Sequence, residues 1–362
     1  MRNRVLLLLL LVLPQWLSAA VDEARIEQLE EQIEALADML EQGGGGEATQ
    51  ATQFGAYGEL HYQSNEKGNN KIDFHRWVLF MSHEFNEQIR VFSELEVEHA
   101  MVGEGQAGAL ELEQSYISLT PRSGTEVKLG LFLLPIGIIN ETHEPPRFYG
   151  VERNPIEKII IPATWWESGV MLSQQFASGV SYDVALHSGL NVSDSVDLRK
   201  GRQRSAKANG NAWAVTGRLN YSGLAGLLFS LALQHQSDLN QSASDSLGAA
   251  QLYESHLVWQ SGALSLKALY AAWNIEGRQA RLLKKDRQQG GYLEAAYRFN
   301  PQWGMFVRQN RWQTVQNIDK EQLDLGVNWW LHEDVVVKMD YQQSNQPAGD
   351  LQALNLGVGY QF

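Results

Sequence analysis

From residue 53 onward, hydrophobic and polar side chains alternate along the chain with a period of two. In one such stretch, Val180, Tyr182, Val184 and Leu186 alternate with mostly polar residues. Successive side chains of a β-strand point to opposite faces, so this pattern predicts strands with one apolar and one polar face. The same alternation recurs at 213–221, 323–331 and 335–342.

The connections between these stretches are alternately short and long. Short turns are expected at 85–88, 121–125, 177–179, 222–224, 261–262, 300–301 and 332–334. Longer polar connections are expected at 64–72, 99–109, 135–166, 189–210, 236–249, 274–289, 314–320 and 344–351. They separate sixteen strands of roughly 9–11 residues, the length that crosses a bilayer on a tilt. The pattern predicts an all-β fold, a sixteen-stranded antiparallel transmembrane β-barrel over residues 53–362, with both ends in the periplasm.

A soluble β-sandwich or a secreted carbohydrate-binding domain is the alternative for such a strand-rich chain. A sandwich needs a buried face, but it does not need aromatic residues gathered at the strand ends. Trp and Tyr lie near the predicted ends, as interfacial girdles require, at Trp77, Trp213, Trp259, Trp273, Trp303, Trp329, Tyr221, Tyr297 and Tyr360. The mean hydropathy of −0.30 does not exclude a barrel, because its two faces cancel in the average.

The last predicted strand, LNLGVGYQF (354–362), alternates strictly and finishes on Tyr360 and Phe362. We expect it to pair with the first strand, near 54–62, because an unpaired strand edge in lipid costs several kcal/mol per backbone group. Phe362 would then occupy the periplasmic aromatic girdle.

Residues 1–20 have the features of a secretory signal peptide. Arg2 and Arg4 precede an apolar run at 5–13, and small residues follow at 18–20. The apolar run is too short to span a membrane, although an anchor helix is the alternative interpretation. We expect the mature chain to lie outside the cytoplasm.

Residues 21–42 predict a short periplasmic coiled-coil helix. Its apolar residues are spaced alternately three and four apart, at Ile26, Leu29, Ile33, Leu36 and Leu40. The Gly-rich segment 43–52 follows as a flexible linker. Self-association of the helices is the expected use, and an amphipathic helix packed on the barrel is the alternative.

Composition limits the possible chemistry. The chain has no cysteine, which excludes disulfides and thiolate metal sites, and its net charge of −13 argues against nucleic-acid binding. The sequence contains no nucleophile elbow, zinc-protease motif or phosphate loop, so we expect no catalytic residues, no metal and no cofactor. An outer-membrane hydrolase that uses His143 is the enzymatic alternative, and an envelope tether that uses the coiled coil is a structural one.

The connection at 135–166 is the longest, and loops of this length in a compact fold are usually functional. We expect it to fold inward and narrow the lumen, with constriction residues Glu141, Glu144, Arg147, Glu152, Arg153 and Lys158. In this hypothesis Arg147, Arg153 and Lys158 contact passing anions. The alternative is that these charges pair with one another and hold the loop.

Other charged residues divide between the predicted mouth and the predicted lumen. Two basic loops are expected at the mouth, with Arg199, Lys200, Arg202, Arg204, Arg278, Arg281, Lys284 and Lys285. They could concentrate anions, dock on lipopolysaccharide or simply be solvated. Expected lumen residues are Arg218, Lys267, Arg298, Arg308, Lys338, Glu94 and Glu96. Inward acids nearly balance these cations, which predicts a weakly selective pore.

Three segments resemble the phosphate-selective porin O and P family of bacterial outer-membrane porins: GAYGELHYQSN (55–65), VKLGLFLLPIGIINETHEPPRFYGVERNPIEKIIIPATWWESGV (127–170) and the heptad helix. The terminal Tyr360-Gln361-Phe362 also resembles the signal that the barrel assembly machinery reads in outer-membrane proteins. The resemblance covers essentially the whole mature chain and implies sixteen strands, homotrimers and anion transport. The arginine ladder and lysine cluster by which that family selects phosphate are not matched position by position here.

The sequence therefore predicts an outer-membrane porin for passive diffusion of small hydrophilic solutes, including anions such as phosphate. The expected partners are outer-membrane lipid, lipopolysaccharide, the assembly machinery and further copies of the chain.

Overall fold

The computed structural model describes residues 51–103, 105–242, 247–346 and 349–362. The predicted signal peptide (1–20) and coiled-coil helix (21–42) lie outside these residues, as does most of the predicted linker (43–52). The seam residues Ile26, Leu29, Ile33, Leu36 and Leu40 lie outside them too.

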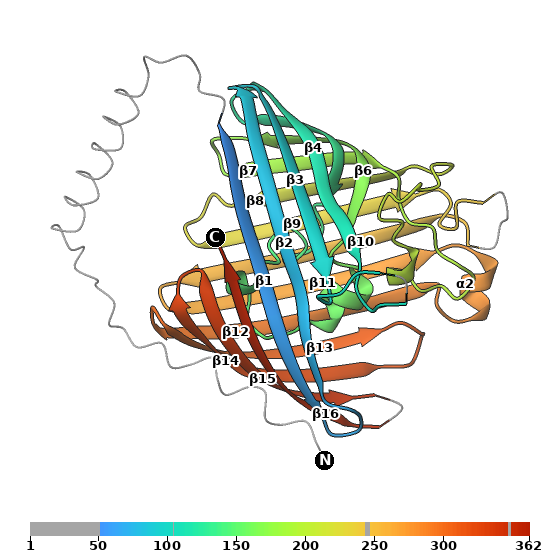
Figure 1. Ribbon diagram of the computed structural model, residues 1–362. Helices are drawn as coiled ribbons and strands as arrows, with labels where there is room; N and C mark the ends of the chain where they lie inside the picture. The colour runs from blue at the N-terminus through green and yellow to red at the C-terminus, as the bar shows by residue number, and fades with distance from the viewer. Residues whose placement is uncertain (1–50, 104, 243–246, 347–348) are drawn as a thin grey trace, which may run out of the picture. The chain divides into compact units, whose positions relative to one another are not determined.

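Sixteen strands make up the barrel in the part of the chain that the structure describes (Figure 1). They are β1 (Thr52–Asn65), β2 (Lys71–Asn86), β3 (Ile89–Glu98), β4 (Leu110–Arg122), β5 (Thr125–Leu133), β6 (Trp166–Gln175), β7 (Val180–His187), β8 (Ala214–Tyr221), β9 (Leu227–Gln236), β10 (Ala250–Ser261), β11 (Leu264–Ile275), β12 (Arg287–Asn300), β13 (Trp303–Gln313), β14 (Lys320–His332), β15 (Val335–Asn345) and β16 (Leu351–Gln361). In the described parts of the long connections lie four short helical turns: η1 (Pro145–Arg147), η2 (Ile156–Ile160), η3 (Arg199–Gly201) and α2 (Arg278–Leu282). Within the described ranges, no helix is both long and apolar enough to cross a membrane.

Each strand pairs antiparallel with its neighbours in chain order, and β1 pairs with β16 to close the barrel. Tyr57 lies opposite Gln361, and the Ala56 and Phe362 backbones exchange hydrogen bonds of 3.0 and 2.9 Å. The predicted closure is therefore confirmed, and it leaves no strand edge to be solvated in lipid.

The predicted strand number and the alternation of short and long connections are confirmed. The predicted uniform strand length was wrong, because the strands run from 8 residues in β7 to 16 in β2. The strand β7 is short because the chain turns inward directly after it, where the Ser188 hydroxyl donates to the buried Glu167 carboxylate.

The two faces of the strands differ as the alternation predicts. In β13, Met305 and Val307 are exposed on the outer face, whereas Phe306, Arg308 and Asn310 are buried on the inner face. An apolar outer surface and a polar interior are what lipid outside and water inside require.

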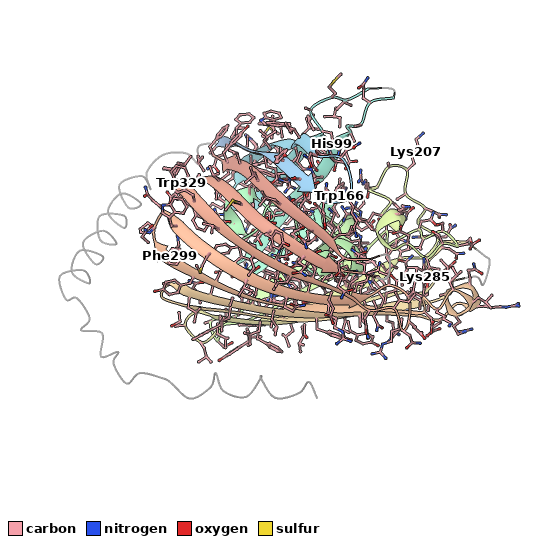
Figure 2. The ribbon with its side chains drawn as sticks, turned by 90° about the horizontal axis from the view of Figure 1, so that it is seen from below. His99, Trp166, Lys207, Lys285, Phe299 and Trp329 are labelled. Atoms are coloured by element: carbon pink, nitrogen blue, oxygen red, sulfur yellow. The ribbon has the colours of Figure 1, made fainter. Side chains whose placement is uncertain are left out.

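Aromatic side chains gather at the end of the barrel that carries the short turns. Trp303 stacks on Trp329 with ring centroids 5.3 Å apart, and the nearby Phe299 is half exposed. Figure 2 shows Phe299 and Trp329 at this end and the charged Lys207 and Lys285 at the opposite end. These aromatic residues form one of the predicted interfacial girdles.

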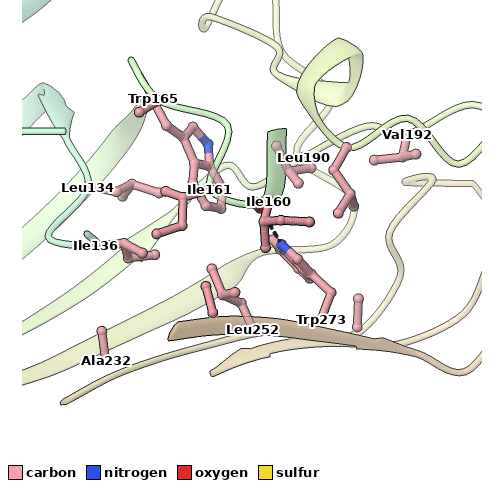
Figure 3. Close-up of a cluster of buried hydrophobic side chains, with 14 of the residues drawn as sticks. Leu134, Ile136, Ile160, Ile161, Trp165, Leu190, Val192, Ala232, Leu252 and Trp273 are labelled. Carbon is pink, nitrogen blue, oxygen red and sulfur yellow. Dashed lines mark hydrogen bonds between the residues drawn. The ribbon is translucent and has the colours of Figure 1, made fainter. Parts of the chain in front are cut away.

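The β5–β6 connection, residues 134–165, folds inside the barrel, and we call it the inner loop. Its hydrophobic side chains form one buried cluster with Ala232, Leu252 and Trp273 on the inner face of β9, β10 and β11, and Trp273 lies beside Ile160 (Figure 3). The Trp273 indole N–H donates to the Ile160 carbonyl at 2.9 Å. This apolar contact keeps the loop in the lumen, because undocking it would expose the cluster to water.

Candidate functional site

A buried carboxylate fixes the shape of the inner loop. Glu157, on η2, is fully buried and accepts hydrogen bonds from the backbone N–H groups of Ile138 (2.8 Å) and Ile139 (2.5 Å). It also accepts one from the Tyr292 hydroxyl of β12 at 2.7 Å. The two limbs of the loop are thus joined to each other and to the barrel wall.

A cavity of ≈ 300 Å³ lies between this loop and the barrel wall. It is lined by the inward faces of β1, β2 and β3, by His99 directly after β3, by the inner loop and by Trp166 at the start of β6. The β7–β8 connection (188–213), which we call the second loop, completes the lining. The lining of this cavity is rich in charge, and we call it the constriction cavity. Its charged residues and histidines are Glu59, His61, His75, Arg76, Glu96, Glu98, His99, Glu152, Arg153, Lys158, Arg199, Arg202 and Arg204.

The arginines on the loop side of this cavity are held mainly by neutral oxygen atoms. Arg153 donates to the Thr164 hydroxyl at 2.5 Å, and Arg199 donates to the carbonyls of Lys158 and Ala163. Arg202 donates to the Arg199 carbonyl at 3.2 Å and to the Thr164 carbonyl. Because these acceptors carry no formal charge, the positive charge of the three guanidinium groups is not compensated by a direct partner among the described residues.

Burial and mutual repulsion act on the same arginines. Burial, followed by the charges of Arg202 and Arg153, lowers the pKa of Arg199 to about 9. Burial and the charge of Arg153 lower the pKa of Arg202 to about 10, and burial followed by the charge of Arg76 lowers the pKa of Arg153. A cluster of cations that destabilise one another gains free energy when an anion enters it.

The wall side of the cavity is acidic and already paired. Arg76 is buried, and its Nε lies 2.7 Å from Glu59. His61 lies between two carboxylates, 3.0 Å from Glu59 and 3.0 Å from Glu152. Arg204 of the second loop forms an ion pair with Glu111. The cavity therefore has a predominantly cationic loop side and an acidic wall side.

Two titratable groups of the inner loop respond to this environment. Burial alone would raise the pKa of Glu152, but the hydrogen bond to His61 and the charge of Lys158 hold that pKa well below its usual range. Burial and the charges of Arg76 and Arg153 hold the pKa of His143 well below its usual range. Glu152 therefore stays ionised and His143 stays neutral near pH 7.

The remaining predicted constriction residues have different surroundings. Lys158 pairs with Glu152 at 3.2 Å and is about half exposed, and Arg153 lines the constriction cavity. Glu141 and Glu144 line a separate cavity of ≈ 320 Å³, together with Glu94. Arg147 is exposed and makes no ion pair within the described part of the chain, and it does not line the constriction cavity.

Most of the predicted lumen cations are neutralised by acids of the wall. Arg308 lies 3.0 Å from Glu294 and 2.9 Å from Asp324, and Lys267 lies 3.3 Å from Glu294. Arg218 pairs with Asp183 at 2.8 Å and with Glu141. These cations are compensated at short range, so their effect on a passing anion is weak.

Two predicted lumen cations contact other groups. Lys338 donates to the Gly150 carbonyl at 2.9 Å and lies over the Phe148 ring, so it anchors the inner loop. Arg298 stacks on Trp330 and donates to the Pro301 carbonyl at a short turn, so it lies at the end of β12.

The predicted acidic wall is present at the inner face of β3 and β4. Glu94 and Glu96 are buried, and Glu94 accepts hydrogen bonds from the Tyr57 hydroxyl (3.2 Å) and the Gln114 amide (2.6 Å). Glu96 and Glu98 line the constriction cavity itself.

The structure places the two predicted mouth loops differently. Arg199, Arg202 and Arg204 line the constriction cavity, deeper than the mouth position that we expected. They lie there because the second loop is joined to the inner loop by the hydrogen bonds of Arg199 and Arg202, and because its Leu190 and Val192 belong to the same buried apolar cluster as the inner loop. Lys200 is 83% exposed and pairs with Asp197.

The other basic loop does not line the constriction cavity. Arg278, Arg281, Lys284 and Lys285 all belong to the β11–β12 connection, which contains α2. Lys285 donates to the Ser195 carbonyl at 2.6 Å, which ties this loop to the second loop.

Several site residues were not predicted from the sequence. Arg76, Glu59 and His61 line the cavity from adjacent strands, and the Trp166 ring lies 6.0 Å from the Arg202 guanidinium carbon and 5.7 Å from that of Arg204. The sequence signal available for Arg76 is a change of phase in the apolar alternation, which runs through Ile72 and Phe74 and resumes one residue late at Trp77, where the structure has a β-bulge.

The contacts of His143 do not fit a hydrolase. Its ring lies 2.8 Å from the Tyr57 hydroxyl, 3.2 Å from Glu113 and 3.1 Å from the Asn140 carbonyl. Among the described residues, no serine contacts it, so the nucleophile and base pair that acyl transfer needs is not formed there.

Comparison with known proteins bears on this geometry. The family described as phosphate-selective porin O and P matches residues 54–362. An uncharacterized protein of Aquifex aeolicus (strain VF5) is 33% identical over 231 residues, which are 61% of this chain and 50% of that protein. The chain thus spans about half the length of the curated relative that it matches.

Solved structures show the same fold at low sequence identity. An anion-selective porin from Comamonas acidovorans has a TM-score of 0.64 at 12% identity, covering 86% of this chain and 100% of that one. OmpF of Salmonella typhi, in complex with daunomycin, has a TM-score of 0.64 at 12% identity, covering 86% of this chain and 97% of that one. OmpT of Vibrio cholerae, an outer membrane protein, has a TM-score of 0.61 at 8% identity, covering 88% of this chain and 99% of that one.

Proposed function

The chain belongs to the phosphate-selective porin O and P family, and from this premise we propose that it forms a passive outer-membrane pore in which small anions cross the constriction cavity. The solute gradient drives the flux. The preferred solutes are small hydrophilic anions, and inorganic phosphate is included because guanidinium groups bind its oxygen atoms in pairs.

One observation carries this proposal. Six cationic side chains and four carboxylates line the cavity, which leaves a net charge of two positive before the histidines are counted. The barrel as a whole carries the opposite charge, because residues 51–362 hold 26 Lys and Arg against 33 Asp and Glu, a net charge of −7. A positive net charge at the narrow part of an otherwise negatively charged pore favours anions there.

The acidic wall limits that preference. Glu96 and Glu98 lie in the same cavity as Arg199 and Arg202, so a cation also finds a favourable side on which to pass. Opposed charges of this kind produce a transverse field that orients solutes and a modest ion preference. We therefore expect weak anion selectivity.

Planar-bilayer recording of the purified full chain tests the proposal. We expect stepwise conductance and, in a potassium chloride gradient, a reversal potential displaced toward that of chloride. Replacing chloride by phosphate should leave a measurable current. A membrane that shows no conductance steps, or a reversal potential on the potassium side, would contradict the proposal.

We further propose that the chain assembles as a homotrimer. The heptad segment 21–42 supports this, and one of the similar structures, OmpT of Vibrio cholerae, is described as a trimer form. We expect the segment to lie in the periplasm, because the short-turn end of the barrel faces that side. Light scattering of the chain with and without residues 21–52 tests the role of the helix, and equal masses would exclude it.

Membership of a porin family favours a channel over the enzymatic alternative. Lipid and lipopolysaccharide remain the proposed partners of the outer surface, and the assembly machinery remains the proposed partner of the terminal Tyr360 and Phe362. A tether function that uses residues 21–42 would require envelope binding by that segment alone, which a pull-down with cell-wall fragments measures.

A further inference from the structure

Two histidines and an aspartate converge at the rim of the constriction cavity. His99 Nδ1 lies 2.9 Å from both carboxylate oxygens of Asp73, and His75 Nδ1 lies 3.2 Å from the Oδ2 of the same carboxylate. The candidate ligand atoms of the three residues all lie within 4.8 Å of one another. We call these three residues the rim cluster.

Backbone irregularities bring the cluster together. Glu59 pairs with Arg76 and Leu60 pairs with Phe74, so His75 is the extra residue of a β-bulge in β2. The bulge lets His75 turn inward, where it stacks on His61 with ring centroids 4.7 Å apart. Neither strand periodicity nor the spacing of the histidines reveals this arrangement.

His99 reaches the cluster through its own unusual backbone. It follows β3 directly, and its φ angle is +54°, in the left-handed region that few non-glycine residues adopt. Its backbone N–H donates to the His75 carbonyl at 3.1 Å. The two rings are thereby held edge to face with their centroids 5.6 Å apart.

The spacing between Asp73 and each imidazole matches the coordination shell of a divalent transition metal, and the candidate ligand atoms of the two histidines lie within 4.8 Å of each other. Ligand atoms at about 2.0–2.2 Å from one zinc ion lie about 2.9–3.6 Å from each other in tetrahedral to octahedral geometry. The two distances from Asp73 oxygens to imidazole nitrogens, 2.9 and 3.2 Å, fall within that range. Two imidazoles and one carboxylate suit Zn²⁺, Ni²⁺ or Cu²⁺ and leave a position for water.

The cluster is accessible to a solute in the lumen. The side chains of Asp73, His75 and His99 are about one third exposed, and both histidines line the constriction cavity. Glu59, Glu98 and Glu152 line the same cavity. Glu59 and Glu152 are already paired with Arg76, His61 and Lys158, so the attraction for a divalent cation comes mainly from Glu98, which forms no ion pair among the described residues.

We propose that Asp73, His75 and His99 form a binding site for a divalent transition metal, such as Zn²⁺, at the rim of the constriction cavity. The bound ion adds two positive charges to the otherwise acidic wall side. Occupancy of the site therefore raises the preference of the pore for anions. This consequence for permeation rests on the proposed function, whereas metal binding itself does not.

Isothermal titration of the full chain in detergent with zinc chloride tests binding directly. We expect one saturable zinc site per chain and no comparable heat with magnesium chloride, because imidazole ligands disfavour Mg²⁺. His75→Gln and His99→Asn should each weaken zinc binding by about tenfold or more, since each removes one of three protein ligands. Asn is chosen at position 99 because it tolerates a positive φ.

His83→Gln is the matched control. His83 also lies on β2, but it contacts Thr52 near the short-turn end and belongs to no such cluster. It should bind zinc as the unchanged protein does. Absence of saturable zinc binding would overturn the site. So would zinc binding by the His75→Gln and His99→Asn variants that is as tight as that of the unchanged protein, provided that circular dichroism shows all variants folded.

Reversal potentials with and without zinc test the consequence. We expect zinc to shift the reversal potential of the unchanged protein toward chloride, and to leave that of the double variant H75Q/H99N unmoved. Zinc binding without any shift would overturn the coupling to permeation. A protein that binds zinc but carries no current would overturn the proposed porin function and support the metal site.

Discussion

Removal of the charge of Arg202 tests most directly whether the loop-side arginines set the selectivity of the pore. Arg202 lines the constriction cavity, and its guanidinium group donates to carbonyl oxygens of Arg199 and Thr164. Arg202→Gln removes one positive charge and keeps a donor at the position of Nε, which contacts the Arg199 carbonyl, while the contact of the terminal guanidinium nitrogen with Thr164 is lost. The substitution should therefore change the field in the cavity more than its shape.

The structure gives the size of the effect. A cavity of ≈ 300 Å³ has an equivalent radius of about 4 Å, so an ion at its centre lies about 5 Å from a charge on its lining. One unit charge at that distance in water contributes about 0.8 kcal/mol, which screening at about 0.1 M salt reduces to about 0.5 kcal/mol. An anion loses this stabilisation and a cation gains it. The permeability ratio of chloride to potassium should then fall about fivefold.

The assay is the reversal potential of single channels in a potassium chloride gradient. Lys200→Gln is the matched control, because it removes the same charge two residues away from a side chain that is 83% exposed. We expect Lys200→Gln to leave the reversal potential unchanged. Equal shifts in both variants, or no shift for Arg202→Gln, would refute the assignment of selectivity to the constriction cavity.

Three further predictions concern the inner loop and the closure of the barrel. Trp273→Ala removes the indole that packs on the inner loop and donates to the Ile160 carbonyl, so docking of the loop should weaken by about 3–5 kcal/mol. Single-channel conductance should then rise, and an unchanged conductance would contradict the docking role of Trp273. Because the pKa of buried His143 is depressed, the undocked loop binds the proton more tightly, and loop docking should weaken by up to about 1.4 kcal/mol per pH unit below about pH 6.5. Limited proteolysis across pH should show this weakening, and H143Q should lack it. Deletion of Phe362 removes its backbone hydrogen bonds with Ala56, so the heat-resistant barrel band on gels should be lost, and a full yield of that band would refute the closure argument.

The strand count and the closure of the barrel could be predicted because they depend on local patterns. Alternation at Met305, Val307 and their inward neighbours specifies the two faces, and short turns specify antiparallel neighbours. Every residue of such a strand faces either lipid or the lumen, so the alternation predicts the facing of each residue almost directly.

The position of the inner loop could be predicted only in part. Its length indicated a role in the lumen, but its anchorage depends on apolar residues on the inward face of the wall. Leu269, Ala271 and Trp273 are inward residues of β11 that interrupt the expected polar lining. An apolar run on both faces of one strand is the sequence signal that was available for this contact.

The position of the second loop could not be predicted from local pattern. The basic residues Arg199, Arg202 and Arg204 read as a solvated or mouth cluster, whereas docking of the loop through Leu190 and Val192 carries them into the cavity. The conformation of a long connection is decided by which surface it covers, and that surface is made of residues distant in sequence.

The sequence by itself therefore determined the barrel, its strand order and the charges that the pore could use. Only the tertiary structure decided which of those charges are compensated. Arg308 and Arg218 meet carboxylates of neighbouring strands, whereas Arg199 and Arg202 meet carbonyl oxygens. The physical reason is that strand faces follow from a two-residue period within one segment, while the field at a point in the lumen is a sum over side chains brought together from several segments.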